Sequence, residues 1–231
     1  MEDWAISLEC AEVGHFSQLN HSYIRINEFM NTPETATKFA CLQKFATITP
    51  QYPGVRSPLP PKVALDWQEQ LSPLLNSVFG KASNGWEVQA WFSLVTASPQ
   101  ELIPMQRFPH VDGTDPNQLA MMLYLHHTDH GGTGFFRHRS TGLEALTDET
   151  FPEYRRALQE NVQQGGLPKA EYVSDGAPYF ERIHKSEGSF NEAIFYRGNL
   201  LHSGIIDNDK PLSADPKEGR LTINAFFRPS P

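Results

Sequence analysis

Cysteine is scarce in this chain of 231 residues: only Cys10 and Cys41 occur, and they form no C-x-x-C motif. This excludes a disulfide framework and a thiolate zinc site as organising features. Long hydrophobic runs are missing as well, since no apolar stretch approaches the length of a membrane span. There are no internal repeats and no low-complexity segments. We therefore expect a globular protein with an ordinary core and no membrane association.

Positive charge is also in short supply. The chain has 19 Lys and Arg against 27 Asp and Glu, a formal net charge of -8, and its basic residues are scattered. This balance disfavours binding to a phosphate backbone, so we expect no nucleic-acid partner. The N-terminal sequence MEDWAISLEC lacks a cationic segment followed by an apolar run, which argues against a secretory signal and favours a reducing cytoplasm.

The length fits a single domain, 1–231, that is large enough to bury a core. Residues 1–84 are predicted to form an N-terminal strand and supporting helices. The strand is expected at 22–30 and the first helix from Asn31 to about Ala46, since Asn31, Pro33 and Glu34 form a helix-start signature. A Pro-rich connection, 50–61, precedes apolar residues at helical spacing from Val63 to Val78, where Pro73 predicts a kink or two short helices.

Residues 85–231 change to a period of two. From Trp86 to Leu94 apolar and polar side chains alternate, as in a strand with one face on a core. Short strand-like runs separated by turn residues follow and indicate a β-sandwich or barrel; they span 101–108, 119–126, 133–139, 179–185, 192–197, 200–206 and 220–228. One charged, helical segment at about 147–164 interrupts them and could be a lid or a surface excursion. The fold class is thus mainly β with flanking helices.

The pair His110 and Asp112, with His202 far downstream, is the most informative motif. His-x-Asp with one more His is the ligand set of the facial triad that holds Fe(II) and leaves coordination positions open. A lone His-x-Asp is weak evidence, and His127 with Asp129 forms a second such pair. That second pair directly precedes Gly131-Gly132, where a hairpin turn is expected, whereas His110 and Asp112 lie between two apolar runs, at a strand end. We therefore favour His110 and Asp112.

Arg220 and Thr222 follow the last His and point the same way in a strand. A planar guanidinium and a hydroxyl suit the distal carboxylate of an organic co-substrate. Alternation places Arg220, Thr222 and Asn224 on one face of this strand and places Tyr124 and His126 on the inner face of the strand at 119–126. The opposite faces are apolar and are expected to pack against the N-terminal helices.

These motifs stand in an order that resembles the 2-oxoglutarate/Fe(II)-dependent oxygenase superfamily, with an organisation similar to its prolyl-hydroxylase-like branch. The order is HVD, LAMMLYLHH, GGTGFF, EAIFYRGNLLHSG and GRLTINAFF. The resemblance rests on sequence motifs over about 85–228. In the first 80 residues it rests only on the pattern of expected elements. It implies a double-stranded β-helix, a jelly roll of eight core strands with N-terminal helices and the insert at 147–164.

By the same resemblance His110, Asp112 and His202 match the iron ligands, Arg220 and Thr222 match the carboxylate clamp, and Tyr124 matches a tyrosine that assists it. Prolyl hydroxylases often have Lys where this chain has Arg220, and the insert is not part of the usual core. A prolyl substrate therefore does not follow, and the chain fits an uncharacterised subgroup.

The resemblance implies a dioxygenase that uses Fe(II), 2-oxoglutarate and O2 to hydroxylate a small molecule or a peptidyl side chain, releasing succinate and CO2. The alternatives are a metal-binding cupin-like protein that does not use 2-oxoglutarate, and a binding module that kept the fold. Candidate substrate contacts are Arg137, Arg139, His126 and Asn224. The substrate, the choice between hydroxylation and desaturation, and the oligomeric state stay open.

Overall fold

Two antiparallel β-sheets and three α-helices make up the computed structural model, which describes residues 4–128 and 130–230. The helices are α1 (Pro33–Ala40), α2 (Pro61–Phe79) and α3 (Phe151–Gly165). The strands are β1 (Ala11–Phe16), β2 (His21–Ile26), β3 (Gly54–Pro58), β4 (Trp86–Val95), β5 (Leu119–Tyr124), β6 (Thr133–His138), β7 (Phe180–Lys185), β8 (Ala193–Arg197), β9 (His202–Gly204) and β10 (Leu221–Pro229).

The pairing of these strands is that of a jelly roll. The larger sheet has the order β1-β2-β8-β5-β10-β4-β3, and the smaller sheet has the order β7-β6-β9. An isolated antiparallel bridge joins His110 to His202 and adds a fourth chain segment beside β9. Four central strands of the large sheet (β4, β10, β5 and β8) thus face four segments of the small one. The predicted mainly β fold with a jelly-roll core is confirmed.

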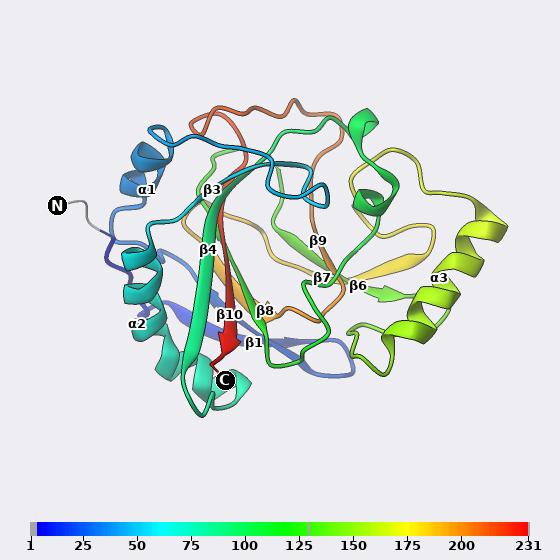
Figure 1. The fold of residues 1–231 in the computed structure, drawn as a ribbon, viewed down its shortest axis with the longest axis horizontal. Coiled ribbons are helices and arrows are strands. Elements are labelled where there is room, and N and C mark those ends of the chain that lie inside the picture. The colour runs from blue at the N-terminus through cyan, green and yellow to red at the C-terminus, as the bar shows by residue number, and fades with distance from the viewer. Residues whose placement is uncertain (1–3, 129, 231) are drawn as a thin grey trace.

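Side-chain alternation separates the two faces of the large sheet as the sequence predicts. Leu119, Met121 and Leu123 of β5 join the main hydrophobic cluster, whereas Tyr124 and Ala120 join a separate cluster on the inner face. The apolar residues of β10 pack in the same main cluster, together with α2. Figure 1 shows α1 and α2 on the outer side of this sheet and α3 beyond the small sheet. The inner face is thus left to line the site.

The helices differ from the sequence prediction in their bounds. Helix α1 ends at Ala40 rather than Ala46, because the backbone of Ala46 exchanges hydrogen bonds with Arg56 of β3. Helix α2 is continuous through Pro73, so of the two predicted alternatives, a kink or two short helices, the second is wrong. Pro73 has no backbone N–H, so one carbonyl in the preceding turn of the helix lacks its usual donor. Because Pro73 is exposed, water can hydrate that carbonyl instead. Within the described residues, no helix has the length and apolar character needed to cross a bilayer.

Two further sequence predictions need correction. Residues 101–108 do not form a strand; two 3-10 helices, Pro99–Glu101 and Pro104–Arg107, occupy this region, each with a proline at its start. The expected hairpin at Gly131-Gly132 is absent, because β5 and β6 belong to different sheets. The helical insert is confirmed as α3, which buries Tyr154 in a cluster with Leu146 and Phe180.

Candidate metal centre and its cavity

A backbone bridge holds His110 next to His202. The amide of His110 donates to the His202 carbonyl (2.9 Å), and the amide of His202 donates to the His110 carbonyl (2.8 Å). Such a reciprocal pair fixes the two backbones at close separation. The imidazole rings lie 4.5 Å apart between centroids. Residues 92 positions apart in the chain are therefore brought together by strand pairing rather than by side-chain contact alone.

Asp112 is positioned by a different neighbour. Its amide donates to the carbonyl of Gly198 (2.8 Å), in the turn that joins β8 to β9. The two segments lie close together here, since a Cβ built at Gly198 would be in ordinary van der Waals contact with the Asp112 Cβ, at 3.4 Å. The Asp112 carboxylate lies 3.4 Å from His202 Nε2 and 4.0 Å from His110 Nε2.

The three side chains fit a divalent metal ion by the chemistry of their donors. One ligand atom from each of His110, Asp112 and His202 lies within 4.8 Å of the other two. His202 Nδ1 donates to the Leu200 carbonyl at 2.8 Å, which fixes the proton on Nδ1 and leaves the Nε2 lone pair for a metal. Two imidazoles and one carboxylate on one side of a cavity are the donor set of a facial triad. The structure thus brings together the three predicted ligands.

Burial sets the protonation of this group in the absence of a metal. Desolvation lowers the pKa of His202 to about 4 and raises the pKa of Asp112 to about 6. The His110 side chain is 56% exposed; desolvation of its ring and the neighbouring His202 lower its pKa to about 4. Both imidazoles are therefore neutral near pH 7, the form that binds a metal.

A cavity of about 420 Å³ opens beside the three residues. This volume falls in the range of small-molecule sites, roughly 300–1,000 Å³. Its walls come from the segment before β3, the loop before His110, and the inner faces of β5, β8, β9 and β10. Its principal polar and charged lining residues are Gln51, Tyr52, Arg56, Gln106, His110, Asp112, Thr133, His202, Ser203, Arg220 and Asn224.

Arg220 lines this cavity and is only 3% exposed. Its Nε and Nη2 donate to the carbonyl of Gly131 (3.3 and 2.9 Å), and Nη2 also donates to the carbonyl of Gly132 (3.1 Å). Its guanidinium lies 5.6 Å from the centre of the Tyr124 ring. No described residue accepts a hydrogen bond from Nη1, so one end of this buried cation is available to a ligand.

Thr222 and Tyr124 lie beside each other in the sheet but are engaged with other residues. The two are direct partners in the pairing of β10 with β5. The Thr222 hydroxyl donates to Asn224 Oδ1 at 2.9 Å, and the Tyr124 hydroxyl contacts Thr133 Oγ1 at 2.7 Å and Ser186 Oγ at 3.0 Å. Neither residue lines the cavity, but their respective hydrogen-bond partners, Asn224 and Thr133, do.

Of the four predicted substrate contacts, only Asn224 lines the cavity. Arg137 instead forms an ion pair with Glu144, Nη2 to Oε1 at 2.6 Å, and Glu144 is buried. Arg139 is exposed beyond the end of β6. His126 packs beside Tyr124, and burial lowers its pKa to about 3, so its imidazole is a neutral group outside the cavity wall.

Of the alternative ligand pair, Asp129 lies outside the described residues. His127 is exposed, and its ring stacks on Phe190 with centroids 4.0 Å apart. No group of three potential ligands that includes His127 is present in the described part of the chain.

Sequence reasoning missed Arg56 and Tyr52, which supply one wall of the cavity. Both lie in or beside the Pro-rich connection at 50–61, whose composition hides the short strand β3. The one available signal was the alternation Val55, Arg56, Ser57, which is too short to indicate a strand without knowledge of its partner.

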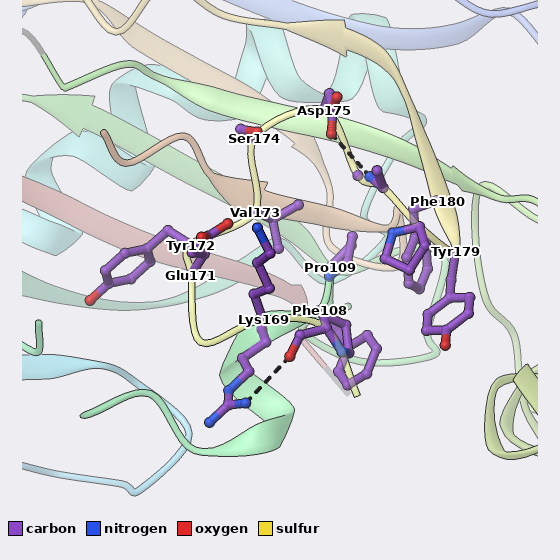
Figure 2. A pocket seen from close by; sticks show the side chains of 15 residues that line it. Phe108, Pro109, Lys169, Glu171, Tyr172, Val173, Ser174, Asp175, Tyr179 and Phe180 are labelled. Carbon is purple, nitrogen blue, oxygen red and sulfur yellow. Dashed lines mark hydrogen bonds between the residues drawn. The ribbon is translucent and has the colours of Figure 1, made fainter. Parts of the chain in front are cut away.

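A second hollow of about 320 Å³ adjoins the first, and Phe108 and Tyr172 line both. Figure 2 shows the segment from Lys169 to Phe180 passing around it. Tyr172 is fixed by its hydroxyl, which donates to the Ala97 carbonyl at 2.6 Å, and by two hydrogen bonds to Asn208. Tyr172 is therefore a side chain of fixed position that lines both hollows.

Comparisons with known proteins give a family and a set of distant structures. Residues 9–227 match the model of a family described as "Family of unknown function (DUF6445)". No curated protein gives a significant match. Among solved structures, the chain resembles viral collagen prolyl hydroxylase vCPH from Paramecium Bursaria Chlorella virus-1 in its 2OG complex, with 13% identity, 90% of this chain and 96% of that chain covered, and a TM-score of 0.48.

Apo HygX from Streptomyces hygroscopicus has 9% identity over 90% of this chain and 82% of that chain, with a TM-score of 0.44. EvdO2 from Micromonospora carbonacea var. aurantiaca has 12% identity over 94% of this chain and 93% of that chain, also with a TM-score of 0.44. Because these TM-scores lie below 0.5, the assignment of the jelly roll rests on strand pairing alone.

Proposed function

The chain belongs to the family of unknown function DUF6445, and we propose that it is a non-haem Fe(II)- and 2-oxoglutarate-dependent dioxygenase that hydroxylates a small molecule or a peptidyl side chain. The observation that supports this most is the juxtaposition in one cavity of two neutral imidazoles, one carboxylate and a buried guanidinium. The first three are the donor set of a ferrous site, and the fourth is a site for the carboxylate of a co-substrate.

His110, Asp112 and His202 would hold the metal. When bound, Fe(II) together with 2-oxoglutarate and O2 supplies the oxidising chemistry, with release of succinate and CO2. The protein holds the imidazoles neutral and fixes the His202 tautomer through Leu200, so no proton must leave either ring at neutral pH. Asp112 supplies the one negative charge of the ligand set.

Arg220 would bind the far carboxylate of 2-oxoglutarate through Nη1. Its other nitrogens donate to the carbonyls of Gly131 and Gly132, which hold the guanidinium in place before a ligand arrives. A buried, pre-oriented guanidinium binds a carboxylate more strongly than a mobile surface one, because less side-chain entropy is lost and water competes less. Asn224, held by Thr222, supplies a further polar group in the same cavity.

The cavity supports a small molecule over a folded protein as the substrate. Its volume of about 420 Å³ lies in the range of small-molecule sites, and its wall includes the fixed side chain of Tyr172. Apolar residues around the triad, among them Val95, Met122 and Phe226, exclude water from the reacting groups.

A second candidate is a metal-binding jelly roll of the cupin-like kind that uses no 2-oxoglutarate. The observation in its favour is that Nε and Nη2 of Arg220 already bond to backbone carbonyls, as in a purely structural arginine. The two candidates differ in the fate of 2-oxoglutarate.

Succinate production separates them. Protein loaded with Fe(II) is incubated in air with 13C-labelled 2-oxoglutarate, and succinate is followed by NMR over hours to detect slow turnover without a substrate. We expect labelled succinate from the parent and at least tenfold less from Asp112→Asn, which lacks the anionic ligand. Metal binding without succinate, across a broad panel of candidate substrates, would favour the cupin-like candidate.

A further inference from the structure

A second guanidinium, that of Arg56, lines the cavity from β3. β3 pairs with β4 so that Arg56 is opposite Ser93, and Ser93 is opposite Thr222 of β10. Paired residues project to the same face of a sheet, so Arg56 shares the inner face with Thr222 and Arg220. Two strand spacings, about 9–10 Å in total, separate the backbones of Arg56 and Thr222, which leaves room for two ligands side by side.

Arg56 has no hydrogen-bonded or ion-paired side-chain partner among the described residues, and the Asp112 carboxylate attracts it only at longer range. Its guanidinium lies 4.1 Å from the centre of the Tyr52 ring and 5.9 Å from that of Trp91. Its Nε is buried without a hydrogen-bond partner. No ion pair or side-chain hydrogen bond joins it to another residue in 4–128 or 130–230. Stacking on Tyr52 orients the planar group, but it does not neutralise it.

The charges of the cavity leave Arg56 unbalanced. Asp112 is the one acidic residue among those that line it, and Arg56 and Arg220 are the two arginines. With the proposed function, a ferrous ion, Asp112, the 2-oxoglutarate dianion and Arg220 together have no net charge. Arg56 is the cation that remains, and a partly buried cation without a partner is unfavourable.

We propose that Arg56 binds the carboxylate of the substrate, and that the substrate is a small monoanionic acid with an apolar body and no free ammonium group. This inference rests on the proposed function and names the substrate class for that site. The apolar body would lie against Met122, Met105 and Phe226, which line the same cavity. An ammonium group would find no acidic partner there, because Asp112 belongs to the metal site.

The first experiment separates this proposal from the proposed function. Anaerobic protein with Fe(II) is titrated with 2-oxoglutarate, and the visible charge-transfer band reports binding. If the parent shows no band, the proposed function fails. If the parent shows the band, Arg56→Gln is expected to bind 2-oxoglutarate with an affinity within about threefold of the parent. A loss tenfold or larger in Arg56→Gln would assign Arg56 to the co-substrate and overturn the proposal.

The second experiment uses three probes with one carbon skeleton: 4-methylpentanoate, its neutral amide 4-methylpentanamide, and L-leucine, the same acid with an ammonium group. Binding is measured by saturation-transfer NMR on protein loaded with Zn(II) and saturating 2-oxoglutarate, whose own signals show whether it is displaced. We expect the acid to bind at least about tenfold more tightly than the amide and more tightly than L-leucine, because a charge-assisted hydrogen bond is lost in the amide.

Matched variants locate the effect. Arg56→Gln is expected to bind the acid and the amide equally, and Arg56→Lys, which keeps the charge, to recover part of the preference. Arg156→Gln removes an exposed arginine of α3 and should behave as the parent. A thermal melt of each variant confirms that it is folded. Equal binding of acid and amide by the parent, or an unchanged preference in Arg56→Gln, would overturn the role of Arg56. If L-leucine binds as tightly as the acid, the inference that the substrate has no free ammonium group is overturned.

Discussion

At the scale of single residues, the Asp112 carboxyl decides how the centre responds to pH. Burial raises its pKa to about 6, whereas the pKa of His110 and that of His202 are lowered to about 4. Between these values Asp112 is protonated and both imidazoles are neutral. A metal must therefore displace one proton from the site below pH 6 and further protons only near pH 4.

Metal affinity is accordingly expected to be constant above about pH 6.5 and to fall about tenfold per pH unit between pH 6 and pH 4.5. Isothermal titration with Mn(II), in buffers of constant ionic strength from pH 5 to pH 8, measures this profile. Above pH 6.5 the carboxylate is already ionised, and these points are the internal control. An affinity that is flat down to pH 5 would contradict the raised pKa of Asp112.

The same shift predicts that Asp112→Asn stabilises the metal-free protein. A carboxyl whose folded pKa exceeds its unfolded value contributes stability below about pH 3.8, and this contribution is lost as pH rises through about 6. At pH 8 the ionised group therefore opposes folding by an amount on the order of 3 kcal/mol. We expect Asp112→Asn to unfold at higher urea concentration at pH 8 in the presence of a chelator, and the difference to vanish near pH 4. A parent that is the more stable protein at pH 8 would refute this.

At the scale of elements, the ends of the strands hold the charged groups in place. Glu144 is buried between β6 and the N-terminal hairpin, where Arg137 and His21 bond to its carboxylate. Removal of one partner leaves a buried charge short of a partner, which is strongly unfavourable. This gives Arg137, which the sequence placed among the candidate substrate contacts, a structural explanation.

Arg137→Gln is therefore expected to lower the free energy of unfolding by about 2 kcal/mol, a value below that for a fully buried pair because Arg137 is partly exposed. Its affinity for 2-oxoglutarate should equal that of the parent. Urea unfolding and the anaerobic titration measure the two quantities. Arg139→Gln, at the exposed neighbour, is the control and should change neither. If Arg137→Gln loses ligand binding without losing stability, Arg137 contributes to the binding site and the structural explanation is wrong.

Gly132 joins the start of β6 to the segment after β7. A Cβ there would lie 2.3 Å from Ser186 Oγ and 2.7 Å from the amide nitrogen of Gly188. Its carbonyl accepts a hydrogen bond from Arg220. Gly132→Ala must therefore move the backbone that orients the guanidinium. We expect a loss of stability of about 1–3 kcal/mol and a several-fold weaker 2-oxoglutarate affinity.

Gly131→Ala is the milder neighbour, because the nearest atom to its Cβ is a side-chain carbon of Ile205 at 3.1 Å. Melting temperatures and 2-oxoglutarate titrations of both variants test the difference. An unchanged affinity in Gly132→Ala, despite a lowered melting temperature, would show that the backbone carbonyl does not position Arg220. This pair also explains the absent hairpin: the two glycines permit close packing rather than a tight turn.

Across the whole molecule, the sequence predicted those parts of the fold that local pattern controls. Alternation in β5 and β10 placed Tyr124 and Arg220 on the inner face, because one apolar face of each strand must meet the helices. The resemblance predicted which three side chains, those of His110, Asp112 and His202, lie together. The sequence could not place residues whose position depends on pairing between distant segments. Arg56 is the main example, because the register of β3 against β4 is what directs its side chain to the cavity.

The same long-range pairing joins the two parts of the chain into one site. Arg56 and Tyr52 come from the first 84 residues, whereas the three candidate metal ligands and Arg220 come from the jelly roll. One hydrophobic cluster includes residues of α1, α2 and the central strands of the large sheet. The N-terminal part therefore supplies a wall of the cavity as well as support for the sheet.

The anaerobic spectrum of the protein with Fe(II) and 2-oxoglutarate tests the central claim most directly, because it needs the metal, the co-substrate and the cavity together but no knowledge of the substrate. The parent should show a visible charge-transfer band, and Arg220→Ala should show none at the same 2-oxoglutarate concentration while it still binds one metal ion. A parent without the band, or an Arg220→Ala variant with the same band and the same affinity, would contradict the account.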